Sequence, residues 1–377
     1  MKPLNLFKSS RFALWHSWWR GWIAGIWGCL MLAAAPVYGQ LRPVEMADTI
    51  VQTYPAAQTD ILEIRNKYGN VHINTWDKPD IRVQIEIISR ANQYDKAGLR
   101  MKEVEIRERR FGQKIQLETN FTGNSFLRLG RELTERGVNV NYEVHLPPSI
   151  ALVIDNRFGN VYIDDRLGNV DLKLNYGKLV AGRLGGTNNV FDLSLGGADI
   201  AYLGGGDVKV AFSPLTIEQA GNLSLTASSA QVRIDRTDRL RLSASLGKLE
   251  LGEVGEISGE VSSASFTMQR LGEKMDLVVR YATSFDVMQV AKGFESITLD
   301  GRFTSFRLGF APEAAFDLDA EIQFGKMTTF AIGDPLSEAI MADKITAYTG
   351  RIGATRAGTG SSTLTVRSKY GNLKLTK

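Results

Sequence analysis

The chain has 377 residues, of which 44% are hydrophobic and 23% charged, a size and composition that suit a folded body with a large apolar core. Lys and Arg number 45 against 41 Asp and Glu. Four of the basic residues and none of the acidic ones lie in the first 39 positions, so the rest of the chain carries no net charge, which argues against nucleic acid as a partner.

The first 39 residues differ from the rest of the chain. They are basic, they include the only cysteine, Cys29, and they contain an apolar stretch from Trp22 to Ala35. Because Val37-Tyr38-Gly39 offers residues that a signal peptidase tolerates, we predict a signal peptide at 1–39. The alternative is an uncleaved membrane anchor, although the apolar stretch is near the lower length limit for a span. Either segment exports the body, and after cleavage no membrane span and no cysteine remain.

Residues 40–60 read as a polar lead-in, and 61–149 read as a β-rich N-terminal cap with one short helix. Weak helical spacing covers 91–102, and 122–136 has the composition of a loop. Strand-like alternation in this cap occurs at 61–66, 71–75, 81–88, 104–109, 114–120 and 138–146. A cap is expected because the open end of a stack of strands exposes unpaired backbone groups.

One short phrase recurs from residue 61 to the end of the chain. It reads Tyr68-Gly69-Asn70-Val71-His72-Ile73, then Phe158-Gly159-Asn160-Val161-Tyr162-Ile163, and finally Tyr370-Gly371-Asn372-Leu373-Lys374-Leu375. We call the small residue of each phrase its corner residue. Corner residues stand at 69, 159, 177, 196, 213, 230, 247, 264, 283, 304, 325 and 371, so from 159 to 325 the repeat length is about 17 to 21 residues.

The positions around each corner residue predict two short strands per repeat. The residues two and four places after it are apolar in nearly every copy, with a mostly polar residue between them, as in a strand with one buried face. A second alternating run precedes each phrase, for example Val170-Asp171-Leu172-Lys173-Leu174. The corner residue is expected to be small for two reasons: glycine takes positive φ without strain, and stacked corners leave little room for a Cβ.

The predicted fold class is therefore all-β, with a single-chain parallel β-solenoid at 150–377 preceded by the cap. An antiparallel sandwich is the alternative, but its hairpins need not keep so constant a repeat length. Near the end of the chain, 334–347 breaks the rhythm and allows a short helix, and Gly358-Thr359-Gly360 reads as a bend.

Candidate catalytic chemistry is sparse after the leader. Only His72 and His145 remain, and neither is marked as part of a zinc site or a catalytic triad. Asp164-Asp165 reads as the end of a turn, because neighbouring strand residues point to opposite faces. Gly204-Gly205-Gly206 lacks a following lysine and reads as a corner, not as a phosphate loop. We predict no catalytic residue, cofactor or metal.

Hydroxyl side chains are the one surface feature of this sequence that could suit a repetitive ligand such as a polysaccharide. Four dipeptides suggest a stripe near one corner: Ser228-Ser229, Ser262-Ser263, Thr283-Ser284 and Thr304-Ser305. The simpler explanation is that small hydroxylated residues stack at corners and bond their own backbone.

The segments 66–78, 140–147 and 156–161 resemble the putative-adhesin family of uncharacterised exported bacterial proteins, which is common in Bacteroidetes-type bacteria and related to head-GIN domains. The resemblance covers nearly all of the chain after the leader. It implies a parallel β-helix outside the cytoplasm and no known enzymatic activity, and it supplies no functional residues to transfer.

Three functional hypotheses follow. The first is a non-enzymatic, adhesin-like binding scaffold of the cell envelope that binds a polysaccharide or an envelope protein, in the periplasm, at the outer membrane or on the cell surface. The second is a polysaccharide-processing enzyme on a β-helix, which can use Asp, Lys and Arg alone. The third is a periplasmic partner in envelope-stress signalling.

Overall fold

The computed structural model describes residues 44–122, 137–330, 336–340, 344–353 and 362–377. They belong to the unit 42–377, and the predicted leader lies outside the described residues. In this part of the chain, 23 strands form one hydrogen-bonded sheet and one helix accompanies them, which confirms the all-β prediction. No helix in these ranges is both apolar enough and long enough to cross a membrane.

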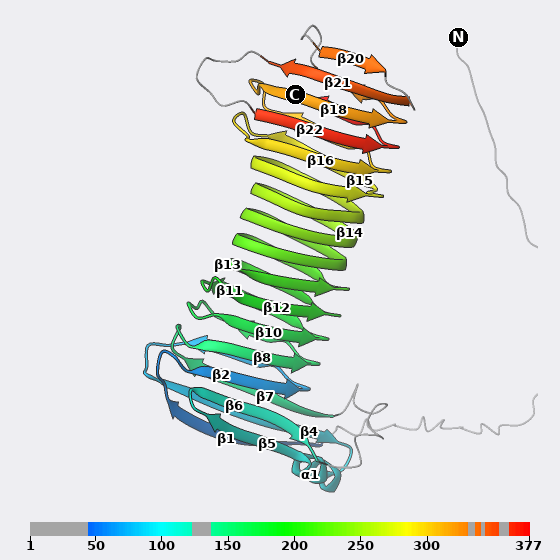
Figure 1. Ribbon diagram of the computed structural model, residues 1–377. Helices are drawn as coiled ribbons and strands as arrows, with labels where there is room; N and C mark the ends of the chain where they lie inside the picture. Colours follow the sequence, from blue (N-terminus) through cyan, green and yellow to red (C-terminus); the bar gives the residue numbers. More distant parts are fainter. Residues whose placement is uncertain (1–43, 123–136, 331–335, 341–343, 354–361) are drawn as a thin grey trace, which may run out of the picture. The chain divides into compact units, whose positions relative to one another are not determined.

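Strands pair in parallel with their equivalents in the next repeat (Figure 1). Those that precede a corner residue form one series, and those that follow it form another. The first series is β8 (Ala151–Arg157), β10 (Val170–Asn175) and β12 (Asn189–Ser194); the second is β9 (Val161–Ile163), β11 (Lys178–Leu184) and β13 (Gly197–Ala211). We call the two strands of one repeat a layer. The expected bend between two strands in each repeat is present.

The middle of the stack is one continuous strand of 67 residues, β14 (Pro214–Arg280). Figure 1 shows it coiling through several layers. It turns at Ser229, Leu246 and Ser263, whose φ angles lie between 50° and 60°. The layers continue with β15 (Ser284–Val290), β16 (Ser296–Arg302) and β17 (Phe306–Phe310).

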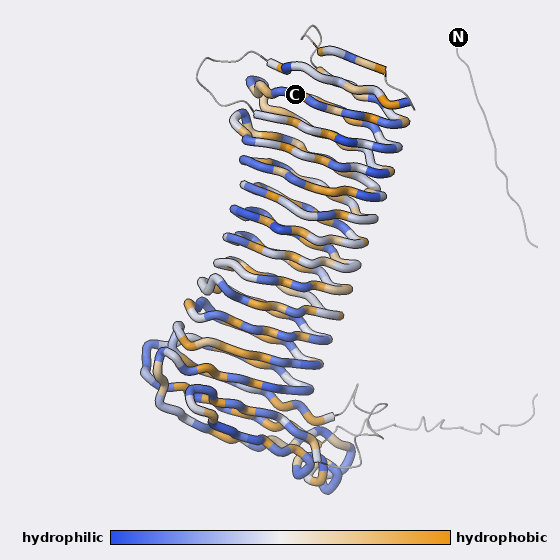
Figure 2. The backbone as a smooth tube through the Cα atoms, viewed as in Figure 1, coloured by the Kyte–Doolittle hydropathy of each residue, from blue (hydrophilic) through white to orange (hydrophobic). Residues whose placement is uncertain are grey.

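Inward-pointing side chains build one continuous apolar core. The residues two and four places after the corner residues are buried as predicted, among them Val161, Leu179, Ile200 and Leu251. Figure 2 shows the alternation of hydrophobic and hydrophilic positions along each strand. Burying one such aliphatic side chain stabilises a fold by about 1.5–3 kcal/mol, so the core accounts for a chain without disulfides.

The first phrase lies beside the second although 90 residues separate them. β2 (Ile61–Lys67) pairs residue for residue with β8, and β3 (Val71–Thr75) pairs with β9. The chain between them forms β4 (Asp80–Ala91), α1 (Tyr94–Lys102), β5 (Val104–Phe111), β6 (Lys114–Phe121) and β7 (Val138–Leu146). The single short helix predicted in this region is thus present.

Antiparallel pairing ends the parallel stack on this side. β6 and β7 still run parallel to β2 and β3, but β5 is antiparallel to β6 and β4 is antiparallel to β7. β1 (Val44–Pro55) adds an antiparallel edge to β4, so most of the segment expected to be a polar lead-in is a strand. The lead-in was misread because a mostly exposed edge strand shows little apolar alternation.

The layers near the other end do not follow chain order. β22 (Ser362–Lys369) lies between β16 and β18 (Phe316–Gln323), and β23 (Leu373–Thr376) lies between β17 and β19 (Met327–Thr328). β21 (Ile345–Ile352) then pairs antiparallel with β18, and β20 (Leu336–Ile340) pairs with β21. In the range 334–347, where the sequence allowed a short helix, the described residues 336–340 and 345–347 are strand, and Lys344 alone belongs to a 3₁₀ turn.

Candidate binding surface

Each corner contains a left-handed residue directly before a small one. Near residue 283 these are Tyr281 and Ala282, so the corner residue lies one place earlier than the sequence spacing indicated. Tyr68, Phe158, Leu195 and Phe303 are further left-handed residues, and across the described corners these φ angles lie between 50° and 63°. We had expected the glycine to take this conformation, so that prediction is wrong for most corners. The second reason for a small corner residue holds, because a Cβ on Gly159 would lie 1.9 Å from the carbonyl oxygen of Gly69 in the neighbouring layer.

Asparagines in the phrase satisfy the backbone around the corner. Asn156 is buried, and its Nδ2 donates to the carbonyl oxygens of Gly159 at 2.8 Å and Gly69 at 3.2 Å. The asparagine after the glycine links layers instead: Asn70 Oδ1 accepts from the backbone N–H of Asn160 at 2.9 Å. Asn160 Oδ1 in turn accepts from the N–H of Lys178 at 2.9 Å. The asparagines of the phrase are therefore explained by hydrogen bonds to the backbone of their own corner and of the neighbouring layers.

The left-handed residues of the corners form a line of exposed or half-buried side chains, which we call the corner ladder. In layer order it comprises Tyr68, Phe158, Tyr176, Leu195, Phe212, Ser229, Leu246, Ser263, Tyr281, Phe303, Tyr370 and Phe324. Aromatic rings stack face to face at both ends, for example Phe158 on Tyr176 at 4.8 Å and Phe303 on Tyr370 at 4.7 Å between ring centroids. A left-handed residue costs about 1–2 kcal/mol, and a ring pair returns about 0.5–1.5 kcal/mol.

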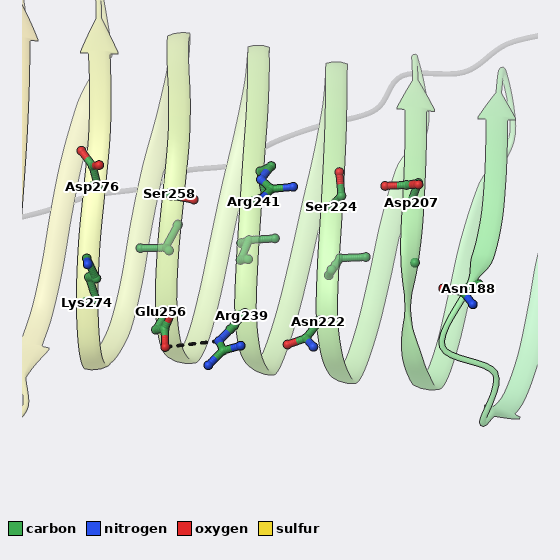
Figure 3. A pocket seen from close by; sticks show the side chains of 14 residues that line it. Asn188, Asp207, Asn222, Ser224, Arg239, Arg241, Glu256, Ser258, Lys274 and Asp276 are labelled. Atoms are coloured by element: carbon green, nitrogen blue, oxygen red, sulfur yellow. Dashed lines mark ion pairs between the residues drawn. The ribbon is translucent and has the colours of Figure 1, made fainter.

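A polar groove crosses the central layers on one strand face (Figure 3). It has a volume of about 620 Å³. Equivalent positions of successive layers line it in two rows: Asp207, Ser224, Arg241, Ser258 and Asp276 form the first, and Asn188, Asn222, Arg239, Glu256 and Lys274 form the second. We call this surface the layered groove. A second hollow of about 720 Å³ adjoins it and shares Asn222, Arg239 and Glu256.

Charges of both signs line the layered groove. Arg239 Nε lies 3.2 Å from Glu256 Oε1, and Lys274 lies 3.8 Å from Glu295 outside the groove. Arg241 stands between Ser224 and Ser258 of the neighbouring layers, and it belongs to none of the ion pairs in the described part of the chain. A groove of this kind offers hydrogen-bond donors and acceptors repeated about every 4.8 Å, the spacing of adjacent strands.

The two histidines lie closer together than their separation in sequence suggests. Asn74 pairs with His145 and His72 pairs with Glu143, so the imidazoles occupy adjacent strands. His72 is exposed, as predicted, and its ring stacks on Tyr162 at 4.5 Å. His145 contacts the ring of Trp76 at 5.3 Å. Within the described ranges, no three His, Cys, Asp or Glu side chains form a cluster that could hold a metal ion.

The other residues considered from the sequence have structural contacts. Asp165 Oδ1 accepts from the N–H of Arg183 at 2.7 Å in the next layer. Gly206 has a φ of 134°. Gly204, Gly205 and Gly206 lie against the backbone of the preceding layer, as expected for a segment where the chain bends. Gly358-Thr359-Gly360 lies outside the described residues.

The proposed hydroxyl stripe is not formed. Ser229 and Ser263 occupy the left-handed position, but Leu246 stands in the layer between them. Thr304 occupies the small corner position, where its Oγ1 accepts from the N–H of Ala282 at 3.1 Å. Ser284 at the start of β15 pairs with Ser265 of β14, and their hydroxyl oxygens are 2.9 Å apart. The four dipeptides are not at equivalent positions, because Ser228-Ser229 and Ser262-Ser263 precede their small corner residues, whereas Thr283-Ser284 follows Ala282 and Thr304-Ser305 begins at the corner itself.

Two buried charged groups were missed in the sequence. Arg166 is 2% exposed, and its Nη2 donates to the carbonyl oxygen of Ile150, while Nε and Nη1 have no partner among the described residues. Burial lowers the pKa of Arg166 to about 10. Glu63 is also buried, with Arg65 Nε at 2.6 Å and Lys114 in contact. Burial raises the pKa of Glu63, but the two cations outweigh it and the net pKa is lowered.

Comparison with known proteins gives no family assignment. No family model matches this chain, and no curated protein matches it significantly. Among solved structures it is similar to a putative cell adhesion protein from Clostridium sporogenes, with 12% identity, a TM-score of 0.19, and 89% of this chain and 99% of that chain covered.

Two further solved structures are putative adhesins. The one from Bacteroides fragilis is 10% identical with a TM-score of 0.28, covering 87% of this chain and 97% of that one. The one from Parabacteroides merdae is 7% identical with a TM-score of 0.31, covering 88% and 97%. The names agree with the resemblance in sequence, but at these TM-scores the likeness establishes neither a shared fold nor a shared function.

Proposed function

We propose that this chain is an exported, adhesin-like binding scaffold without catalytic activity, built on a single-chain parallel β-solenoid. Parallel pairing between strands one repeat apart supports the solenoid, as in the register of β8, β10 and β12. The composition of residues 1–39 supports export to the periplasm, the outer membrane or the cell surface. We further propose that residues 61–149 act mainly as the cap and 150–377 as the solenoid.

The layered groove is the observation that carries this proposal. Its lining comes from at least five successive layers, so a ligand lying along it meets a polar or charged side chain at each step. An extended polysaccharide suits this arrangement because its hydroxyl groups also recur at regular intervals. The mixed charges favour a neutral or weakly charged polymer over a polyphosphate.

The groove also bears on the enzymatic alternative. A glycosidase places two carboxyl groups about 5–9.5 Å apart across the scissile bond. In the first row of the groove, Asp207 and Asp276 are four layers apart, about 19 Å at the usual strand spacing. Glu256 is held by Arg239. These carboxylates therefore support binding better than general acid–base catalysis.

The test measures binding and turnover together. Protein purified after export from the full-length gene is applied to an array of neutral and charged polysaccharides, and the soluble fraction is analysed for cleavage products. Ser258→Trp places a bulky ring in the groove, and Thr226→Trp is the matched control, since Thr226 is exposed on β14 but does not line the groove.

We expect saturable binding without products, lost in Ser258→Trp and kept in Thr226→Trp. Cleavage products would replace the scaffold proposal with the enzymatic one. Binding that survives in both variants would refute the groove as the binding surface. No binding to any polysaccharide would favour an envelope protein as the partner, which a shift in stress-regulated transcription on deletion of the gene would reveal.

A further inference from the structure

Three basic side chains occupy register-equivalent positions in consecutive layers, away from the layered groove. Arg280 at the end of β14 pairs with Arg302 of β16, and Arg302 pairs with Lys369 of β22. All three are exposed. Register partners in a parallel sheet share a face and lie about 4.8 Å apart, so three positive charges form a short row. We call this row the basic corner.

The basic corner differs from most of the stack. Lys67 and Arg157 are also register partners of like charge, but Arg157 is paired with Asp155. Neighbouring layers are joined by ion pairs of opposite sign: Lys178–Asp199, Arg236–Glu253, Arg239–Glu256, Lys274–Glu295, Arg307–Asp286, Lys292–Glu313 and Arg367–Asp319. By contrast, Arg280, Arg302 and Lys369 belong to none of the ion pairs among the described residues. Like charges directly opposite one another on adjacent strands are destabilising. A repulsive row of this kind is expected where an external anion neutralises it.

Nearby carboxylates do not neutralise the row. Arg302 and Lys369 line a shallow hollow of about 170 Å³ together with Asp300 and Glu321. Glu321 lies 3.5 Å from Arg367, which also holds Asp319 at 2.7 Å. Asp300 is exposed and belongs to no ion pair in the described ranges, so one carboxylate faces three cations.

An aromatic surface borders the basic corner. Each of the three cations directly precedes a ring of the corner ladder: Tyr281, Phe303 or Tyr370. These rings stack at 5.1 Å and 4.7 Å, and Phe324 continues the stack at 4.8 Å. Phe303 and Tyr370 are covered by neighbouring rings, and the ammonium group of Lys369 lies 5.5 Å from the centroid of the Tyr370 ring. A ligand therefore meets mainly ring edges, which carry partial positive charge. Both rows therefore favour an electronegative ligand.

From this geometry we propose that the basic corner binds a linear acidic polysaccharide, with successive carboxylates of the polymer on Arg280, Arg302 and Lys369. The row is one residue wide and runs along the stacking direction. A linear polymer matches it because one sugar residue in an extended chain has nearly the length of one layer. An anionic membrane surface fits less well, because it calls for cations spread over a plane and apolar side chains free to insert.

The test compares polygalacturonate with its fully methyl-esterified form, which keeps the sugar chain and removes the charge. The protein is again the exported product of the full-length gene. Arg302→Gln combined with Lys369→Gln removes two charges of the row at similar side-chain length. Lys178→Gln combined with Lys292→Gln removes two charges from ordinary ion pairs and serves as the control.

We expect polygalacturonate to bind more tightly than the ester, and the Arg302→Gln, Lys369→Gln variant to bind it about tenfold more weakly. The control variant should bind as the natural chain does. The melting temperature should not fall in the first variant, since it removes a repulsion. A folded variant with unchanged affinity for polygalacturonate would overturn the proposal.

Two further results would also overturn it and leave the layered groove untouched. Equal affinity for the acid and the ester would mean that charge is not recognised. Binding to phosphatidylglycerol vesicles but not to polygalacturonate would assign the basic corner to a membrane surface. Because the two surfaces share no residue, Ser258→Trp should keep its affinity for polygalacturonate, and a loss there would place the polymer in the groove instead.

Discussion

Replacing Phe303 by alanine and by glycine separates two energies in the corner ladder: the strain of the left-handed backbone and the stabilisation from ring stacking. Phe303 is left-handed, 49% exposed, and stacked on Tyr281 and Tyr370. Losing two ring pairs costs about 1–3 kcal/mol, and losing a half-buried ring adds about 1 kcal/mol. Phe303→Ala should therefore destabilise the chain by about 2–4 kcal/mol, because alanine keeps the left-handed strain and loses the contacts.

Phe303→Gly should be the less harmful of the two. Glycine relieves about 1–2 kcal/mol of left-handed strain and adds about 0.5–1 kcal/mol of backbone entropy cost. The free energy of unfolding of the glycine variant should therefore exceed that of the alanine variant by roughly 0.5–1 kcal/mol. Val180, exposed in the middle of β11 and without positive φ, is the control, and there glycine should be worse than alanine. Urea unfolding followed by circular dichroism measures all four variants. An alanine variant at 303 as stable as the glycine variant would refute the account of strain.

Three other outcomes are expected. Gly159→Ala should cost about 3 kcal/mol or more, since its Cβ would meet backbone of the next layer, whereas Gly293→Ala, with open space around it, should change little in the same urea assay. Arg166→Met should leave stability unchanged or raise it by up to about 2 kcal/mol, because a buried cation without a carboxylate partner is replaced by an apolar chain; a clear loss in thermal unfolding would contradict this. The folded-state pKa of Glu63 is lowered, so its contribution is present above its ordinary pKa of 4.5 and is lost as pH falls through the folded value. Unfolding at pH 6 and pH 3 should therefore show a larger acid loss in the natural chain than in Glu63→Gln, and equal losses would argue against the cluster with Lys114.

The repeat itself could be predicted because each layer carries its own signal. Val161, Leu179 and Phe306 stand at equal distances after small residues, and burial of alternate side chains is a local property of a strand. The left-handed aromatic residues could not be predicted in the same way. An isolated Tyr or Phe avoids that conformation. The fold imposes it even where no ring stacks, as at Leu195 and Ser229, and ring stacking offsets part of its cost at the two ends of the ladder.

The order of the layers along the stack could not be predicted from the sequence. The phrase at Tyr370 identifies a further layer, but Leu373 fits against Phe306 as well as against Met327, and in the fold it contacts both strands. The basic corner was missed for the same reason: Arg302 and Lys369 are 67 residues apart and become neighbours only through this insertion. The entropy cost of closing a long loop is little more than that of closing a short one. Separation in sequence is therefore a weak guide to which strands become neighbours.

The insertion of β22 and β23 also limits the order in which the fold can be assembled. Layers up to β16 and β17 can form one after another in chain order. β18 cannot join them directly, because the strand that separates it from β16 comes 46 residues later. Residues 316–328 must therefore wait until 362–376 have arrived, and the two segments close the stack together. On the export that we propose, the fold would be complete only after β22 and β23 had crossed the membrane.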